Sequence, residues 1–559
     1  MRKKNRLFVN ICCVVSVFAL APQVLADRVP DELASASTAI NDAGLRAHIQ
    51  FLADDLLEGR GPGSRGDRLA QQYIATQLAS LGVKPAAPNG TWFQPVPLVG
   101  FQSYPPESIA LKSGGQTLNL ARSDDYIFTS GRPANSVAVE NAELVFVGYG
   151  MIAPEFQWND YKDVDVKGKV VVVMNNDPSD SPDLFAGKRR LYYGRWDYKY
   201  ATAAEQGAVG AIIIHTTESA GYPYQVVQTS WSGEEFQLKA SGDPPMELRG
   251  WFSEDASKRV FEFSGHDLDE LRAAAEKRDF RPVALGTTLS LAMKCEQREI
   301  STANVLGAIE GSDETLKNEF VIFMAHHDHI GLAAERDGRG DNIYNGAVDN
   351  ASGSSALLTI ARAVSQMKPR PKRSIMFAAV GAEEQGLLGS LHFANDPPVP
   401  AGYLAAVVNI DGLNILGKTH DVNVIGLGKS SMDTLVQTVA DWQGRIVTPD
   451  LFPDRGYYYR SDQFSLAKIG VPGVYLHSGI QVLGKPDGWG KRQLEDWVLT
   501  KYHQTSDEYD PSWNLDGAVQ DVQLLFMTGI LAADADELPT WTVGDEFEAA
   551  RKKALSERE

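Results

Sequence analysis

The sequence predicts an α/β protein in which a layered unit is accompanied by a separate or inserted β-rich unit. Residues 302–539 alternate apolar runs of strand length with stretches of helical spacing, which is the pattern of a layered α/β fold. Residues 135–294 instead form short β-rich runs broken by Gly, Pro and Asp. A length of 559 residues leaves room for two or three domains, so both units can have cores of their own.

The strands follow from apolar runs of strand length. The β-rich region contains two clear examples, residues 144–147 and 170–174. Three further runs have the length of buried strands in the layered unit: residues 320–325, 374–380 and 404–410. We expect all three to be buried strands, because uninterrupted apolar runs of this length are typical of strands that are covered on both faces.

The helices follow from apolar residues at three- and four-residue spacing. Three stretches have this spacing: residues 45–56, 68–81 and 356–367. The turn-rich residues Gly59–Ser64 separate the first two. Residues 545–559 are mostly charged, and we expect them to form a solvated helix.

The net charge of the chain indicates which kinds of binding partner are unfavourable. Asp and Glu number 72 against 53 Lys and Arg, which leaves a formal net charge of −19. A negative field of this size repels phosphate backbones and anionic lipids, and the chain shows no basic patch that would offset it. We therefore expect small or neutral substrates and no nucleic-acid partner.

The first 26 residues have the pattern of a signal peptide. Basic residues open the chain, an apolar stretch runs from Leu7 to Ala21, and Val24-Leu25-Ala26 suits cleavage. An uncleaved membrane anchor is the alternative, but the stretch is shorter than the roughly 20 residues that a span needs. We expect export to the periplasm or medium, without stable membrane association after cleavage. Cys295 would then be the only cysteine, so no intramolecular disulfide forms.

The first group of chemically active side chains follows the strand over residues 320–325. His326, His327 and His329 surround Asp328, and three imidazoles at a strand end need partners for their ring nitrogens. A metal ion would supply one partner. His326 and Asp328 can act together, one imidazole nitrogen binding the metal while the carboxylate holds the other. A purely structural role is the alternative.

Acidic side chains follow the next elements in the same way. Asp349 lies in the small-residue turn before the helix over residues 356–367, where Asp349 or Asn350 could simply cap that helix. Glu383 and Glu384 follow the second strand, and adjacent carboxylates at a buried strand end require a cation or a proton. Asp411 ends the third strand, where a bond to the backbone is the alternative.

A further histidine, His503, lies in a loop-like stretch beside Tyr502. A single histidine in such a stretch would not indicate a functional site. With the groups above, however, it completes a set of two imidazoles and at least three carboxylates on loops around one sheet. These are the ligand types that suit zinc, and the carboxyl ends of the strands are where α/β sheets bind ligands.

The order of these motifs resembles the co-catalytic dizinc aminopeptidases, the family of the bacterial leucyl aminopeptidases and of glutamate carboxypeptidase. The series consists of His326-x-Asp328, Gly346–Gly353, Glu383-Glu384-x-Gly386, Asp411 and Tyr502-His503. Val147–Gly150 and Ala203–Ala208 resemble the protease-associated (PA) domain that some members contain. The resemblance implies a three-layer αβα sandwich with a mostly parallel mixed sheet and an inserted β-rich PA domain.

The resemblance also divides the chain and implies peptide substrates. The expected parts are a signal peptide (1–26), the N-terminal part of the peptidase domain (27–134), the PA insertion (135–295), the main peptidase part (296–540) and a charged tail (541–559). The activity implied is that of an exported aminopeptidase in which a zinc-activated water attacks the N-terminal peptide bond.

Carried over residue by residue, the resemblance implies two Zn²⁺ per chain. Asp349 bridges them, and its peptide bond to Asn350 is cis. The remaining roles are these: His326 and Asp411 bind one ion, Glu384 and His503 bind the other, Glu383 is the general base, Asp328 orients His326, and Tyr502 stabilises the oxyanion.

Two other functions remain open on the sequence. A carboxypeptidase or dipeptidase would need a basic residue for the terminal carboxylate, and Arg460 and Arg455 are available. A binding scaffold on an inactive peptidase fold would be expected to lack ligands or the base, all of which are present. The sequence departs from the family at Gln463, where members often have histidine; this change spares the ligands and bears on the substrate pocket.

Overall fold

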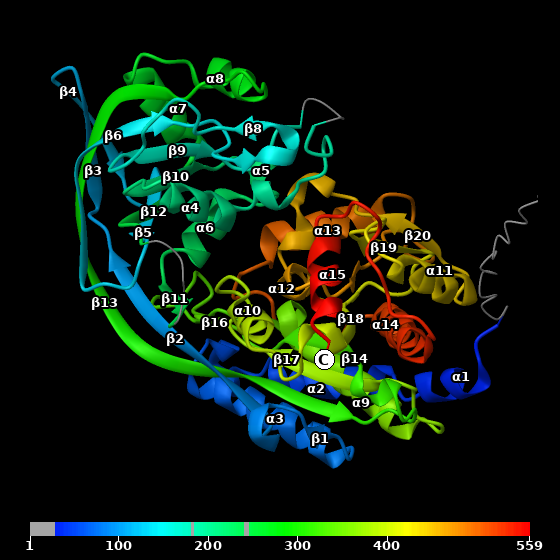
Figure 1. The fold of residues 1–559 in the computed structure, drawn as a ribbon. Helices are drawn as coiled ribbons and strands as arrows, with labels where there is room; N and C mark the ends of the chain where they lie inside the picture. Colours follow the sequence, from blue (N-terminus) through cyan, green and yellow to red (C-terminus); the bar gives the residue numbers. More distant parts are fainter. Residues whose placement is uncertain (1–27, 180–183, 240–244, 559) are drawn as a thin grey trace, which may run out of the picture.

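The computed structural model describes residues 28–179, 184–239 and 245–558, which form two packed units (Figure 1). The predicted signal peptide lies outside these residues. Within the described part of the chain, no helix combines the length and the apolar character needed to cross a membrane.

The larger unit is built on a mixed sheet. Its strands, in spatial order, are β13 (Val283–Ile309), β17 (Ser374–Val380), β14 (Phe320–His326), β18 (Leu404–Asn409), β21 (Gly473–His477), β19 (Asp421–Ile425) and β20 (Ile446–Pro449). The four central strands β17, β14, β18 and β21 are parallel, whereas β13 and β19 run antiparallel to their neighbours β17 and β21. This confirms the predicted α/β class and the mostly parallel sheet.

Helices cover both faces of this sheet, because its strands are apolar on both faces. Phe323 and Phe377 point to one face, and Ile322 and Met376 to the other. The first face is covered by α1 (Asp31–Ser37), α2 (Asp42–Leu52), α3 (Arg65–Ser80), α9 (Gly353–Gln366), α11 (Met432–Trp442) and α14 (Asp516–Asp534). The second face is covered by α10 (Leu388–Asn395) and α12 (Gln463–Lys468). The predicted three-layer αβα sandwich is therefore present.

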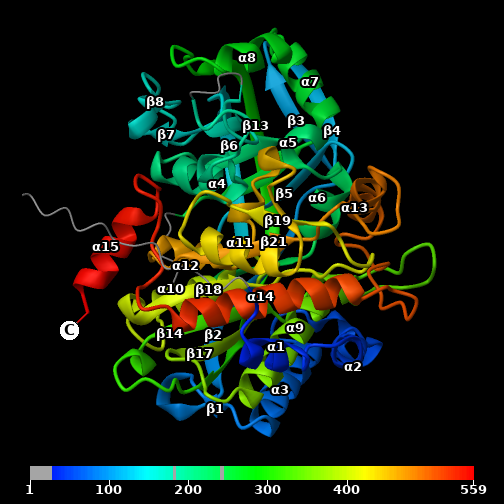
Figure 2. The same ribbon diagram turned by 90° about the vertical axis from the view of Figure 1, so that its right-hand side faces the viewer.

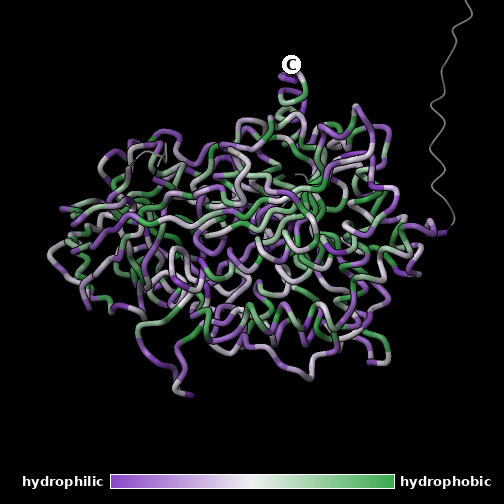
Figure 3. The backbone as a smooth tube through the Cα atoms, turned by 90° about the horizontal axis from the view of Figure 1, so that it is seen from below, coloured by the Kyte–Doolittle hydropathy of each residue, from purple (hydrophilic) through white to green (hydrophobic). Residues whose placement is uncertain are grey.

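Close packing of α14 against the sheet depends on a glycine. Figure 2 shows α14 crossing the face that also carries α9. A Cβ atom on Gly529 would lie 2.3 Å from the ring of Phe323, so only glycine allows this approach. The backbone viewed from below has hydrophilic loops around its outside (Figure 3), as expected for a sheet enclosed between helix layers.

The second unit is rich in short strands, as predicted, and also contains helices. Its main strands are β3 (Ser108–Ser113), β4 (Gln116–Ala121), β5 (Tyr126–Ser130), β6 (Ser136–Phe146), β9 (Val170–Met174), β10 (Gly210–Ile214) and β12 (Leu248–Phe252). Its helices are α4 (Trp196–Glu205), α5 (Thr217–Ala220), α6 (Tyr224–Ser230), α7 (Glu254–Phe263) and α8 (Leu268–Ala275). This unit has its own hydrophobic cores, one on each side of β6, β9, β10 and β12.

Two long strands connect the units. β13 pairs with β6 near its beginning, with β2 (Phe93–Tyr104) along its middle and with β17 at its end. In Figure 1 it is the long curved green strand beside the blue β2. β11 (Glu234–Leu238) pairs with the other edge of β2. The two units are thus connected by a pair of hydrogen-bonded strands. β13 continues without a break through residue 295, where we expected the PA insertion to end.

The C-terminal tail forms a helix, as expected, but that helix is not simply solvated. Within α15 (Glu548–Ser556), Arg551 is only 3% exposed and donates hydrogen bonds to the carbonyl oxygens of Leu404 and Ala405. Ala554 is buried as well. One face of α15 therefore packs against the start of β18, which the high proportion of charged residues in this segment did not indicate.

Candidate active site

The predicted site residues meet at the carboxyl ends of the central strands. His326 is the last residue of β14, while Glu383 and Glu384 follow β17 and Asp411 follows β18. Asp349 precedes α9, and His503 follows α13 (Trp489–Thr500). Donor atoms within 4.8 Å of one another come from His326, Glu383 and Asp411, and from His326, Asp349 and Glu384. Residues far apart in sequence therefore form one cluster.

Asp349 lies at the centre of this cluster and faces a histidine with each carboxylate oxygen. Its Oδ1 is 3.4 Å from Nε2 of His326, and its Oδ2 is 3.5 Å from Nε2 of His503. Burial raises the pKa of Asp349, but its bonds to the two histidines outweigh that effect and hold the pKa well below its usual range. Asp349 is therefore an anion whose two oxygens point in different directions.

The backbone fixes Asp349 in this orientation. The Asp349–Asn350 peptide bond is cis, as the family resemblance implies. The side chain of Asn350 accepts hydrogen bonds from the backbone N–H groups of Gly353 and Gly412, so it serves as the capping residue. The carboxylate of Asp507 accepts the N–H groups of Val348 and Asp349. Capping thus falls to Asn350, which leaves the side chain of Asp349 free to face the cluster.

Glu384 lies between two histidines. Its Oε2 is 2.9 Å from Nε2 of His503, and its Oε1 is 2.5 Å from Nδ1 of His329. Burial and Asp349 raise the pKa of Glu384, yet His503 and His329 outweigh them and bring the pKa to about 2. Glu384 is therefore ionised, and His329 holds its second oxygen.

Glu383 differs from Glu384 in its environment. Burial is the largest cause that raises the pKa of Glu383 well above its usual range, and the neighbouring carboxylates of Glu384 and Asp411 add to the effect. The backbone N–H of Glu383 donates to Oδ1 of Asp328 at 3.1 Å. Adjacent carboxylates with opposite pKa shifts are suited to different tasks: Glu384 to holding a cation and Glu383 to exchanging a proton.

Asp328 lies beside His326 at a longer distance than a hydrogen bond. Its Oδ1 is 3.9 Å from Nδ1 of His326, whereas the backbone carbonyl oxygen of Asp328 is 3.3 Å from the same nitrogen. Both groups face the nitrogen that points away from Asp349. The side chain of Asp411 lies on the other side of the ring, 3.3 Å from Nε2, and accepts a hydrogen bond from the hydroxyl of Ser461 at 2.6 Å.

The cluster has the donor set of a metal centre. It combines imidazole nitrogens with carboxylate oxygens, and zinc accepts both kinds of ligand. Nε2 of His503 and Oδ2 of Asp328 are buried and have no hydrogen-bond partner within the described part of the chain. Several carboxylates this close repel one another unless cations compensate their charge. The residues present therefore fit zinc.

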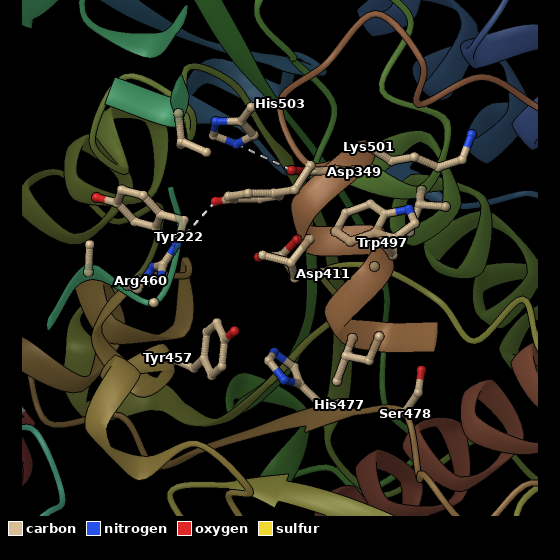
Figure 4. Close-up of a pocket in the computed structure, with 18 of the residues that line it drawn as sticks. Tyr222, Asp349, Asp411, Tyr457, Arg460, His477, Ser478, Trp497, Lys501 and His503 are labelled. Atoms are coloured by element: carbon tan, nitrogen blue, oxygen red, sulfur yellow. Dashed lines mark hydrogen bonds and ion pairs between the residues drawn. The ribbon is translucent and has the colours of Figure 1, made fainter. Parts of the chain in front are cut away.

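The cluster opens into a cavity of about 470 Å³ between the two units. Tyr222 and Trp196 contribute from the β-rich unit, and Arg460 and Trp497 from the larger one. Figure 4 shows Asp349, Asp411 and His503 facing this space. A pocket of this size holds a small ligand rather than the surface of a folded protein.

The basic residues predicted for carboxylate binding occupy different places. Arg460 lines the cavity, and its guanidinium lies 5.4 Å from the ring of Tyr222 and donates to the hydroxyl of Tyr502 at 3.2 Å. Arg455 does not line the cavity and instead stacks on the ring of Phe452 at 3.9 Å. Tyr502 also stacks on His503, with ring centroids 3.9 Å apart.

Gln463 lies outside the cavity, contrary to the expectation that it bears on the substrate pocket. It is 1% exposed, accepts a hydrogen bond from Asn409 and donates one to the carbonyl of Tyr458. The amide of Asn409 also donates to Ser461, which in turn donates to Asp411, so Gln463 is linked to the site through these hydrogen bonds and does not line the cavity.

Several residues without a predicted role contribute to the site. His329 and Asp507 stand within the histidine-containing motifs, so their proximity in sequence was a usable signal. Ser461 donates a hydrogen bond to Asp411, and none of the motifs described above includes it. Ser230 of α6 contacts His503 from the other unit, and no feature of the sequence indicates this contact.

Arg60 holds the loops of the site together. Its buried guanidinium donates to the carbonyl oxygens of Leu52, His327, Asn345 and Gly346. These bonds join the N-terminal helices to the segments that carry His326 and Asp349. The charge of Arg60 also offsets the nearby carboxylates.

We expect Arg60→Met to lower the free energy of unfolding by about 3 kcal/mol or more. Each buried carbonyl oxygen left without a donor costs about 1–3 kcal/mol, and the four costs add only in part. Chemical denaturation measures the loss. Arg68→Met serves as the control, because Arg68 is exposed. Equal stability of the two variants would contradict the assigned role of Arg60.

Both units match known protein families. Residues 304–527 match the profile of Peptidase family M28, and residues 139–242 match that of the PA domain. The larger unit therefore contains a region of peptidase family M28, and the β-rich unit described above contains a PA domain.

Curated relatives match parts of the chain. Aminopeptidase NAALADL1 of Rattus norvegicus is 29% identical over 171 residues, which cover 28% of this chain and 21% of the relative. A probable glutamate carboxypeptidase of Arthroderma benhamiae is 26% identical over 274 residues, or 46% of this chain and 34% of the relative. The matches thus span about a fifth to a third of these relatives.

One solved structure shares the fold over almost its whole length. The aminopeptidase from Aneurinibacillus sp. strain AM-1 superimposes with a TM-score of 0.51 and 18% sequence identity, covering 90% of this chain and 96% of that structure. At this identity the similarity concerns the fold.

Proposed function

We propose that the protein is a zinc-dependent aminopeptidase with two Zn²⁺ per chain that removes the N-terminal residue of peptides. The observation that carries this proposal is the position of Asp349, whose two carboxylate oxygens each face a different histidine. His326 and Asp411 would hold one ion, His503 and Glu384 the other, and Asp349 would bridge them. Relatives named as aminopeptidases support the choice of reaction.

The chemistry follows from the residues around this centre. Zinc, when bound, acidifies a water molecule and polarises the scissile carbonyl group. Glu383 would accept the proton of the attacking water and transfer it to the departing amine. Asp328 keeps Nδ1 of His326 engaged, and the hydroxyl of Tyr502 donates a hydrogen bond to the developing oxyanion.

The size of the cavity favours the end of a peptide. About 470 Å³ between the units accommodates a few side chains of an extended segment. The interior of a long peptide or a folded domain would require the PA domain to move away. We therefore expect short peptides and flexible chain ends to be the substrates.

The test compares a free with a blocked N-terminus on the same peptide. Zinc-loaded protein is expected to hydrolyse an aminoacyl amide and an unblocked peptide, and to cleave their N-acetylated forms at least about 100-fold more slowly. Product analysis by mass spectrometry identifies the bond that is cut. Turnover of only the N-acetylated peptide would contradict the aminopeptidase proposal.

A carboxypeptidase or dipeptidase is the second candidate, because Arg460 presents a cation inside the cavity and forms no ion pair with the described residues. A relative named as a probable glutamate carboxypeptidase points the same way. This candidate predicts that amidation of the substrate C-terminus abolishes cleavage. An Arg460→Met variant should then show a raised KM for free acids only. Zinc-loaded protein that cleaves no peptide at all would instead favour a binding scaffold.

We also propose that the protein is exported, on the basis of residues 1–26. N-terminal sequencing of the protein recovered from periplasm or medium should begin at Asp27. An intact Met1 in a membrane fraction would favour an uncleaved anchor.

A further inference from the structure

A side chain of the PA domain, that of Ser230, contacts the proposed catalytic cluster. Ser230, the last residue of α6, places its hydroxyl oxygen 3.0 Å from Nδ1 of His503, 273 positions further along the chain. Ser230 also lines the cavity beside the cluster. The contact therefore joins the two units at one of the residues proposed to bind zinc.

The surroundings of His503 leave Ser230 as the partner for its outer nitrogen. Nε2 points to Asp349 and Glu384, at 3.5 and 2.9 Å. The ring of His503 also stacks on Tyr502 and lies nearly perpendicular to the ring of His329. Among the described residues, the hydroxyl of Ser230 is the hydrogen-bond partner of Nδ1.

A histidine that binds a metal through one nitrogen needs a partner for the other. That partner fixes the tautomer, orients the ring and increases the basicity of the ligating nitrogen. When Nε2 of His503 binds zinc, the ring hydrogen lies on Nδ1 and is donated to the oxygen of Ser230. The hydroxyl hydrogen of Ser230 remains available to another acceptor.

The PA domain holds Ser230 firmly in place. The adjacent Trp231 packs edge-on against Trp196 and Trp251, with ring centroids 5.0 and 5.7 Å away. The guanidinium of Arg249 lies 5.8 Å from the same ring. Val227, one turn earlier in α6, is buried in this core. A serine at the end of such a packed helix is oriented by its domain.

We propose that Ser230 is a positioning residue for the zinc site at His503, so that this site is complete only when the PA domain is docked. This inference rests on the proposed function, in which His503 binds zinc. Because coupling between two binding events is reciprocal, zinc at this site also stabilises the docked position of α6. The PA domain is then part of the metal centre as well as a wall of the cavity.

The first test measures zinc affinity in the full-length chain by competition with a chelator. In Ser230→Ala, one of the two zinc ions should bind about 10- to 100-fold more weakly, the usual effect of removing an outer partner of a metal-binding histidine. The other ion should keep the affinity it has in the unchanged protein. Ser230→Thr retains the hydroxyl and should restore most of the affinity.

The matched control is Ser232→Ala. Ser232 is exposed two positions further on, so its loss should leave both zinc affinities unchanged. Equal affinities of both ions in Ser230→Ala and in the unchanged protein would overturn the inference. If the unchanged protein does not bind two zinc ions, the proposed function itself fails, and the two failures are thus distinguishable.

The second test detects the linkage between zinc and the PA domain without measuring activity. Adding zinc to the metal-free full-length chain should slow hydrogen exchange of the backbone amides of α6. The protection should be several-fold smaller in Ser230→Ala than in Ser232→Ala. Identical protection in the two variants would show that docking of α6 is independent of the contact with His503 and would overturn the inference.

Discussion

Replacing Glu383 by glutamine is expected to lower kcat by about 100- to 10,000-fold, the range typical of a lost general base. Glutamine has the same shape but cannot accept the proton of the attacking water. The zinc content and the thermal unfolding temperature should change little, because neither of the two positions proposed for zinc depends on Glu383. Steady-state kinetics combined with metal analysis of the purified variant measure both effects.

The metal analysis is decisive in this experiment. Donor atoms of Glu383, His326 and Asp411 lie close enough together to hold one ion, so Glu383 could itself be a ligand. Loss of one zinc ion from Glu383→Gln would assign it that role and remove the proposed base. Glu335→Gln, in an exposed loop, provides the control for a change of charge alone.

Replacing Asp349 by asparagine is expected to abolish measurable turnover and to weaken the binding of both zinc ions by about 100-fold or more. The change removes a negative charge and replaces one ligating oxygen with an amide nitrogen that has no lone pair to offer. The loss should exceed the 10- to 100-fold effect of removing an outer partner, because Asp349 faces both histidines directly. Titration with zinc under chelator control provides the measurement.

The pattern of loss in Asp349→Asn tests the bridging role. Weakening of only one ion would place Asp349 on a single metal and contradict the bridge. Asp487→Asn removes the same charge at an exposed position and should leave both zinc affinities unchanged.

The sequence was most informative where strands are buried on both faces. The apolar runs at 320–325 and 374–380 correspond closely to β14 and β17, and the helix expected over 356–367 lies within three residues of α9 (353–366). Such elements can be predicted from the sequence because nearly all of their side chains pack against apolar neighbours. The polar residues that follow them fall at one edge of a parallel sheet, so the convergence of His326, Glu384 and Asp411 was also foreseeable.

The interface between the two units was not foreseeable. Ser230 belongs to a short helix of ordinary composition, and its role depends on where the PA domain packs. Arg551 was assigned to a solvated tail because charged residues surround it, yet its guanidinium bonds to two backbone carbonyl groups of the sheet. In both cases the role of the residue depends on a contact with a distant part of the chain, and such a contact leaves no periodic pattern in the sequence.

The continuous strand β13 determines how far the two units can be treated as separable. Its 27 residues pair first with β6 and last with β17, so any cut within it leaves unpaired N–H and C=O groups on both sides. We expect a shortened chain that lacks the PA region to expose unpaired strand edges and therefore to aggregate. The two units are therefore joined by a hydrogen-bonded pair of strands and not by a flexible linker.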